Sequence, residues 1–484
     1  MTHPLTTPPT DRLGLELTTS AEAAGHYREG IDRLLGLAEG AAACFEAAIL
    51  AHERFGLAYA ALALAHLVDG RPARARAILV RGRGVLASRP RPAVPATRRE
   101  RWQFEILAAG VGGNDAQARE LAVAHLGEFP RDLIVFALLV ILSQREGPEA
   151  RADLVRLAPE LAPHYGDDWA FLSLRAYVLE ELGRTDEALS LALRALELHP
   201  ACAQAAHVIA QVRYQRREHE EGRRFLAEWL REHAPAMPTL VHLRWHEALF
   251  DLALLDPRAA RSGYDRWIRP AVAIGIPGAL TAAAGLLWGL ALDDRDAPLA
   301  WKDVHRKAAL VTAGTGSAFA DLHVALALAG AGDIAALDRL AAAQQTLACD
   351  GDTAAGSAVL PATLGLRAFI AGEHSAAAAH LEVALGSIGV IAGGNAQRRL
   401  FEDTLIEAYL RAGRFEAAER RLQGRLVGRV TARDLVLLDR VNAGLHLYSG
   451  APTRRSGSRP PETDLRPSAR SASSRRGPGR SAQI

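Results

Sequence analysis

The stretch "RAYVLEELGRTDEALSLALRALELHP", residues 175–200, decides the fold. Apolar residues recur in it with helical spacing, and small residues stand at fixed offsets between them. A glycine divides the stretch and a proline closes it, which is typical of two short helices joined by a turn. The positions concerned are Ala176, Gly183, Ala188, Ala195 and Pro200. The stretch therefore predicts one helical hairpin whose helices touch at small residues.

The same spacing repeats with the period of tetratricopeptide units, which is about 34 residues. One period after Ala176, Ala188 and Ala195 stand Ala210, Gly222 and Trp229, and Pro235 comes one position late. No stretch alternates apolar and polar residues with β-branched enrichment, so we expect no strand. The sequence predicts an all-α, right-handed superhelical solenoid of at least seven tetratricopeptide-like repeats. Further phased sets are Ala63, Gly70, Ala75 and Gly82; Gly113, Ala118 and Pro130; Gly147 and Ala152; Gly365, Gly372, Ala377 and Ala384; Gly413 and Ala418.

Composition divides the chain into three regions. Residues 1–19 are rich in Thr and Pro and are expected to form a flexible N-terminal segment. Residues 20–449 carry the helical periodicity and form the predicted solenoid. Residues 450–484 are rich in Arg, Ser, Pro and Gly. Because such a segment buries too little apolar surface to offset its ordering entropy, we predict a disordered tail.

The charge is unevenly distributed. Residues 451–484 hold eight Arg against two acids, which is +6, so the rest of the chain is −4 because the whole chain is +2. The mildly acidic body lacks the clustered basic face that nucleic-acid binding needs. The arginines of the tail suit an acidic partner or nucleic acid, although a solvated tail without a function of its own is the favoured interpretation.

Cysteine usage and hydropathy predict a cytoplasmic location with no membrane contact. Cys44, Cys202 and Cys349 are widely separated and form no CxxC pair, which fits a reducing compartment. The N-terminus shows no basic and apolar leader. Residues 271–292 are uncharged, but Gly and Ala dominate them and Pro277 interrupts them. A loop followed by a buried helix is therefore favoured over a membrane span.

The first helices of such an array line its concave groove, and the predicted groove changes character along the chain. Near the middle it is polar, with Tyr177, Glu180 and Glu181 in one unit. Near the end it is apolar. A groove of this kind suits a ligand of mixed character. The next polar unit contributes His207, Gln211, Tyr214 and Gln215, and the apolar unit contributes Val359, Leu366, Phe369 and Ile370.

Histidines near residue 244 are the best candidates for site chemistry. His242, Trp245 and His246 fall on one helical stripe. Two histidines four positions apart can bind a metal ion, but a metal site needs three or four ligands. A core stripe with hydrogen-bonded histidines is favoured, and we predict no metal. His207 and His323 complete such a site only where the superhelix brings them close.

The remaining polar candidates are weaker. Tyr264 and Asp265 occur in "GYDRW", where capping or pairing between helices is the favoured role. Asp321 and His323 are two positions apart and so lie on different helical faces. No GK[ST] phosphate loop and no GxSxG nucleophile motif occurs. We therefore predict no catalytic residue and no cofactor.

The stretch "AGGNAQRRLF", residues 392–401, predicts a polar elbow between two helices. Asn395 is placed to cap the following helix. If the elbow also belongs to a site, Gln397 and Arg398 are the residues that carry it.

From about residue 11 to 445 the chain resembles the tetratricopeptide repeat protein 38 family. The resemblance rests on the order of several short elements. The chain departs from the family pattern in the last of them, which is one residue shorter and has Arg399 where an acid is usual. The resemblance implies the fold and no particular activity. The elements are "DRLGLELTTSAEAAGHYREGID" (11–32), "TRRER" (97–101), "HLRWHEALFDLALLDPRAARSGYDRWIRP" (242–270), "LLWGL" (286–290), Trp301, "FADLH" (319–323) and "GGNAQRRLF" (393–401).

Two functions remain open. The leading hypothesis is a non-catalytic scaffold that binds a peptide or protein partner in its concave groove. The alternative is a small-ligand-binding protein or enzyme with a polar pocket of His and Asp residues inside the superhelix. Neither hypothesis fixes the oligomeric state. The candidate ligand-binding residues are His207, Gln211, Tyr214, His242, Trp245, His246, Tyr264, Asp265, Asp321, His323, Asn395, Gln397 and Arg398.

Overall fold

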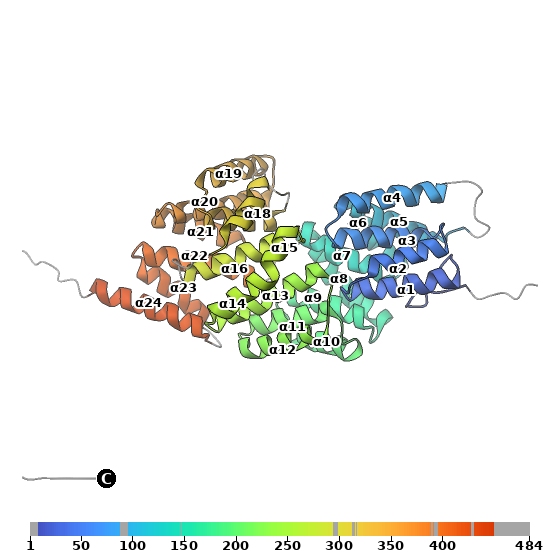
Figure 1. The fold of residues 1–484 in the computed structure, drawn as a ribbon, viewed down its shortest axis with the longest axis horizontal. Helices are drawn as coiled ribbons and strands as arrows, with labels where there is room; N and C mark the ends of the chain where they lie inside the picture. Colours follow the sequence, from blue (N-terminus) through green and yellow to red (C-terminus); the bar gives the residue numbers. More distant parts are fainter. Residues whose placement is uncertain are drawn as a thin grey trace, which may run out of the picture.

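A computed structural model shows the protein as a succession of helical hairpins (Figure 1). It describes residues 8–87, 95–146, 148–293, 299–311, 315, 317–388, 391, 395–426 and 430–449, without the side chains of 144–146, 148–150, 395–397 and 447–449. Within these ranges every extended regular element is helical, and β-type pairing is limited to two isolated bridges. The prediction of an all-α solenoid of tetratricopeptide-like hairpins is confirmed.

Helices that follow one another along the chain pack together. The first part of the chain contains α1 (Ala21–Leu35), α2 (Ala41–Ala51), α3 (Gly56–Val68), α4 (Pro72–Ala87), α5 (Arg98–Gly112), α6 (Asp115–Glu128), α7 (Leu133–Glu146) and α8 (Pro148–Tyr165). The middle contains α9 (Trp169–Glu181), α10 (Thr185–Leu198), α11 (Ala203–Gln215), α12 (His219–Glu232), α13 (Met237–Ala253), α14 (Pro257–Gly263), the π-helical turn η1 (Tyr264–Ile268), α15 (Arg269–Ile274) and α16 (Ala279–Asp293). The last part contains α17 (Trp301–Ala308), the 3-10 turn η2 (Ala309–Val311), α18 (Ala318–Gly330), α19 (Ile334–Cys349), the π-helical turn η3 (Ala355–Val359), α20 (Leu360–Ile370), α21 (His374–Ser387), α22 (Asn395–Arg411), α23 (Phe415–Leu426) and α24 (Ala432–Ser449).

The helices of the middle hairpins repeat with the tetratricopeptide period that the sequence predicts. α9 and α11 begin one tetratricopeptide period apart, and so do α10 and α12. The small residues lie where helices touch. A Cβ added at Gly222 would lie 2.3 Å from Cζ of Phe250, and one added at Gly365 would lie 2.8 Å from Cγ of Leu381. These contacts explain why the repeat needs small residues at those positions.

The turns between α9 and α10 and between α11 and α12 use a left-handed backbone. Gly183 takes φ 73° between α9 and α10, and Arg217, at the equivalent position of the next hairpin, takes φ 58° between α11 and α12. A left-handed conformation costs a non-glycine residue about 1–2 kcal/mol. The Arg217 guanidinium pairs with Asp434 and donates to the carbonyl of Arg425, so contacts with the last hairpin offset that cost.

The uncharged stretch 271–292 contains the end of α15, then a turn and a buried helix, so the expected loop and buried helix follow residue 274. α15 ends at Ile274 with Gly275 as its C-cap, and α16 buries most of its apolar side chains, including Leu286 and Trp288. In the described part of the chain, no helix combines the length and apolarity needed to cross a bilayer.

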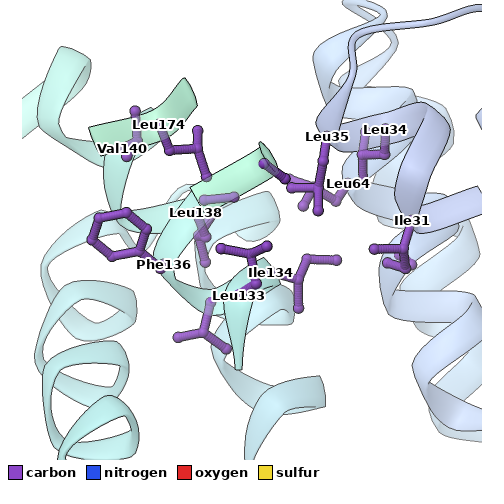
Figure 2. Packing of buried hydrophobic residues seen from close by; sticks show 14 of the residues in the cluster. Ile31, Leu34, Leu35, Leu64, Leu133, Ile134, Phe136, Leu138, Val140 and Leu174 are labelled. Carbon is purple, nitrogen blue, oxygen red and sulfur yellow. The ribbon is translucent and has the colours of Figure 1, made fainter. Parts of the chain in front are cut away.

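In the N-terminal half, α1 packs against α7, so the first hairpin contacts a later one. Figure 2 shows Leu34 and Leu35 of α1 on one side and Leu138 of α7 and Leu174 of α9 on the other, and all four belong to one continuous cluster of buried residues. Backbone contacts fasten this arrangement, because Gly36 O accepts from Ala203 N at 3.1 Å. The early hairpins are thereby tied to the middle of the chain.

The C-terminal half returns to the middle in the same way. α22 packs against α11 and α16 as well as against its sequence neighbours. Trp288 Nε1 of α16 donates to Thr404 Oγ1 of α22 at 2.9 Å. The polar middle of the predicted groove therefore faces α22 of the same chain.

Residues 8–19 pack on the first hairpins. Leu17 is buried, and Arg12 forms ion pairs with Asp32 at 2.7 Å and with Asp168 at 2.8 Å. Thr18 N donates to the Glu100 carboxylate at 2.7 Å. Residues 1–7 and 450–484 lie outside the described residues, so the flexible segment and the disordered tail stay predictions.

Candidate functional site

Three histidines from two neighbouring hairpins come together. His207 lies on α11, and His242 and His246 lie one turn apart on α13. One ring nitrogen of each lies within 4.8 Å of the corresponding atoms of the other two. Nε2 of His207 and Nε2 of His242 are 2.9 Å apart, so one of them donates a hydrogen bond to the other. The packing of α11 against α13 creates this cluster, which the spacing of the histidines along the chain could not predict.

All three imidazoles are held neutral. Burial lowers the pKa of His242 to about 4. Burial, and then the neighbouring histidines, lower the pKa values of His207 and His246 well below the usual range. Neutral imidazoles each offer one nitrogen lone pair at pH 7.

His246 is the least satisfied of the three. Its side chain is buried, and neither ring nitrogen has a hydrogen-bond partner among the described residues. A buried donor or acceptor left unpaired costs about 1–3 kcal/mol. Such an atom calls for a water molecule, an ion or a ligand.

Trp245, which also lies on α13, packs against the two histidines of that helix. Its ring stacks on His242, with centroids 5.5 Å apart and planes at 18°, and contacts His246 at 4.9 Å. The indole is buried. It therefore makes one wall of the histidine cluster apolar.

The buried carboxyl group of Glu180 on α9 is linked to the histidine cluster by Gln211 on α11. With its amide nitrogen turned toward Glu180, Gln211 donates to both carboxyl oxygens at 2.5 and 3.1 Å and accepts from Nε2 of His207 at 3.2 Å. Gln215 donates to the same carboxyl group. Burial, followed by the nearby Glu181, raises the pKa of Glu180 to about 8. Glu180 is thus mostly protonated at neutral pH, a state that its polar position in the sequence did not indicate.

α22 brings Arg398 toward the same region. Burial raises the pKa values of Glu180 and Glu181, and the Arg398 charge partly offsets both shifts. Nη2 of Arg398 also donates to Ile391 O at 3.4 Å. α22 begins at Asn395, but the side chains of Asn395 and Gln397 lie outside the described residues. Their predicted roles stay predictions.

Tyr214 occupies the far end of α11. Its ring contacts His219 at 5.2 Å and Phe250 at 5.8 Å. Burial raises the pKa of its hydroxyl, and the Arg399 charge on α22 opposes that shift. This residue belongs to the contact between the middle hairpins and α22.

The other predicted residues take up local positions. Tyr264 is buried in η1, and Asp265 lies 3.9 Å from Arg261 and 3.7 Å from Arg269. These contacts join α14 to α15, in keeping with the expected pairing role.

Asp321 and His323 both lie on α18. Asp321 accepts from the backbone nitrogen and the hydroxyl of Thr315, both at 2.7 Å, so it holds a local turn. His323 is buried, and its Nδ1 lies 2.8 Å from Phe319 O. The main contacts of α18 are with α16, α17, α19 and α20, whereas the three clustered histidines lie on α11 and α13.

A separate cavity of about 580 Å³ opens at the C-terminal ends of α16, α18, α20 and α22. Phe369 and Ile370 line it, as the apolar end of the groove predicted. Val359 and Leu366 were expected beside them, but that expectation is wrong because both side chains are buried in the core. The sequence interpretation missed Trp288, Trp301 and Arg411, which also line this cavity.

The chain matches no model in a scan of protein families. Several solved structures are similar to it at low identity. Yeast Tom70 is 14% identical with a TM-score of 0.32, covering 89% of this chain and 88% of that one. The P58(IPK) TPR domain is 14% identical with a TM-score of 0.21, covering 84% and 90%. The structure of Naa15/Naa10 bound to HypK-THB is 12% identical with a TM-score of 0.24, covering 83% of this chain and 62% of that one. Scores of this size carry no functional argument, and the fold assignment rests on the regular spacing of the chain's own helices.

Proposed function

We propose that the chain is a non-catalytic tetratricopeptide-like scaffold that binds a peptide segment at the C-terminal part of its groove. The observation that supports this proposal is the cavity of about 580 Å³, which is lined by the C-terminal ends of α16, α18, α20 and α22 and by the first residues of α17 and α21. Partly exposed Trp301 offers aromatic surface there, and buried Trp288 and Phe369 form the wall behind it. The Arg411 guanidinium lies 4.4 Å from the centre of the Phe369 ring. Such a surface suits a peptide that inserts one large apolar side chain and places polar groups at the rim.

The polar middle of the groove is a less favourable binding site for a peptide than the C-terminal cavity. Glu180 is buried there, and α22 packs against α11. A partner would have to displace α22, whereas the C-terminal cavity is open. We therefore place the binding surface at the C-terminal ends of α16, α18, α20 and α22, together with Trp301 at the start of α17.

Selection from a displayed random peptide library tests the proposal. Selected peptides are then titrated into the wild type and into Ile370→Asp, which places a charge in the cavity wall. Val383→Asp on α21 is the matched control, because Val383 is 58% exposed and does not line the cavity. We expect affinity to fall at least about tenfold in Ile370→Asp, since an unpaired charge in an apolar contact costs more than about 1.4 kcal/mol.

Equal binding to the wild type and Ile370→Asp would contradict the proposed surface. Failure to select any peptide above background would contradict peptide binding as the function.

We also propose membership of the tetratricopeptide repeat protein 38 family and a cytoplasmic location. Two resembling elements have defined structural positions that support the first proposal. "TRRER" begins α5, where Thr97 and Glu100 form a capping box and Arg99 pairs with buried Asp132 at 3.2 Å. "HLRWH" supplies the clustered histidines of α13.

The small-ligand hypothesis keeps one specific observation in its favour. His246 has two buried ring nitrogens without partners among the described residues, beside two further imidazoles. This second candidate function therefore concerns the histidine cluster and not the C-terminal cavity.

A further inference from the structure

The cluster of His207, His242 and His246 has the composition of a metal site. Three neutral nitrogen ligands converge, and each comes from a helix rather than from a loop. The pair on α13 is spaced by four positions, so both rings leave the same face of that helix. The third ligand comes from α11 in the preceding hairpin.

The separations suit one small ion. Nitrogen ligands bind zinc at about 2.0–2.1 Å in tetrahedral geometry, so two such ligands stand roughly 3.4 Å apart. In this structure one ring nitrogen from each histidine lies within 4.8 Å of the others, and the closest pair is 2.9 Å apart. Binding of an ion requires rotation of the rings and a His207 that carries its proton on Nδ1, so that Nε2 exchanges its hydrogen bond to Gln211 for the metal.

A hydrogen-bonded core cluster explains only part of the geometry. The contact between His207 and His242 satisfies one nitrogen of each ring, but it leaves His246 with neither nitrogen paired among the described residues. An ion at the centre would engage His246 together with the other two histidines. His207 and His242 are only partly buried, so an ion has access from that side.

The donor set selects the class of metal. Three imidazoles with no ligating carboxylate suit zinc and similar borderline ions, whereas calcium and magnesium prefer oxygen ligands. We propose that His207, His242 and His246 bind one Zn²⁺ ion, with a fourth position left for water or a ligand atom. The ion would join α13 to the hairpin of α11 and α12.

The expectation of no metal came from counting ligands along one helix. A single stripe supplies two histidines, which is too few for a zinc site. The third ligand depends on how α11 packs against α13, which only the three-dimensional arrangement reveals.

Titration of the full chain with Co²⁺, and then displacement by Zn²⁺, tests the proposal. Wild type should bind one equivalent of Co²⁺ and develop the intense visible absorption of four-coordinate cobalt. Zn²⁺ should abolish that absorption and raise the melting temperature, because a ligand that binds the folded state stabilises it. Exposed Cys349 is distinguished by the near-ultraviolet charge-transfer band of a thiolate ligand.

His207→Gln and His242→Gln remove one ligand each from the partly exposed side of the cluster. We expect Zn²⁺ affinity to fall by at least about 10–100-fold, since loss of even an outer-shell partner has that effect. His323→Gln is the control, because it removes a helix histidine that lies outside the cluster and has one unpaired ring nitrogen among the described residues. Its affinity for Zn²⁺ should equal that of the wild type.

Absence of stoichiometric binding in the wild type would overturn the proposal, as would an unchanged affinity in folded His242→Gln. Circular dichroism establishes that each variant is folded. If both substitutions prevent folding, the wild-type cobalt spectrum decides the question alone. Peptide binding at the C-terminal cavity is measured separately, so the two proposals fail independently.

Discussion

Arg217 and Asp434 are 217 residues apart in the sequence, yet their side chains form an ion pair of 3.3 Å. Asp434 is fully buried, and it also accepts from Arg399 at 2.7 Å and from the Thr431 hydroxyl at 2.7 Å. Burial alone would raise the pKa of Asp434, but Arg399 and the Thr431 hydrogen bond hold it below its usual value. One carboxylate thus fastens the last hairpin to the turn of α11 and α12.

Asp434→Asn should lower the free energy of unfolding by about 3 kcal/mol, because it leaves two guanidinium groups without their buried counter-charge. Urea unfolding followed by circular dichroism measures the change. Asp186→Asn is the control, since Asp186 is 94% exposed and pairs with Arg216 on the surface. That substitution should change stability by less than about 1 kcal/mol. Equal effects of the two substitutions would contradict the role given to Asp434.

Gly222→Ala tests the close approach of helices within the repeat. Its Cβ would overlap the Phe250 ring, so we expect a loss of about 1–3 kcal/mol from overpacking. Gly84→Ala in α4 is the contrasting substitution, because no heavy atom outside the helix's own neighbourhood lies within 4 Å of an added Cβ. It should raise stability by about 0.5–1 kcal/mol, since alanine loses less backbone entropy in a helix. Thermal unfolding of both variants decides whether the small positions are steric requirements.

His323 should make the protein less stable in mild acid. Burial lowers its pKa from 6.5 to about 4, so below pH 6.5 the unfolded chain binds a proton that the folded chain refuses. Its contribution to stability is therefore lost as the pH falls from about 6.5 towards 4. Between pH 7 and 5, the free energy of unfolding should fall by about 2 kcal/mol less in His323→Gln than in wild type. Parallel pH profiles for the two proteins would contradict this assignment.

Glu180 should have the opposite effect in mild alkali. Its pKa is raised from 4.5 to about 8, so the folded chain keeps a proton that the unfolded chain has released. Stability is therefore lost as the pH rises through this interval. Between pH 6.5 and 8, wild type should lose about 2 kcal/mol that Glu180→Gln does not lose, since glutamine carries no titrating proton. Chemical unfolding at several pH values measures the difference, and an identical decline in the variant would show that Glu180 is not its source.

The repeat architecture could be predicted because its determinants are local. Ala176, Gly183 and Ala188 reveal one hairpin, and the regular recurrence of that spacing extends it along the chain. The identity of buried and open faces was harder to predict. Val359 and Leu366 have the periodicity of a groove, but the same periodicity belongs to a core face, where they lie.

The candidate site depended on contacts that periodicity does not contain. His242 and His246 could be placed on one face from their spacing, whereas the position of His207 beside them follows from packing between hairpins. The polar character of Glu180 suggested solvent, but contact with Gln211 and Gln215 and the return of α22 leave it buried. Side chains far apart in the sequence determine these environments.

The two returns of the chain, through Gly36 with Ala203 and through Arg217 with Asp434, change how the molecule responds to force. An open repeat array contacts only its neighbours, so pulling on its ends peels off one hairpin after another. Here the first hairpin and the last hairpin are each bonded to the hairpin of α11 and α12. The extension of a single molecule should therefore occur in a few large steps, each releasing many helices at once, and not in a regular series of small ones.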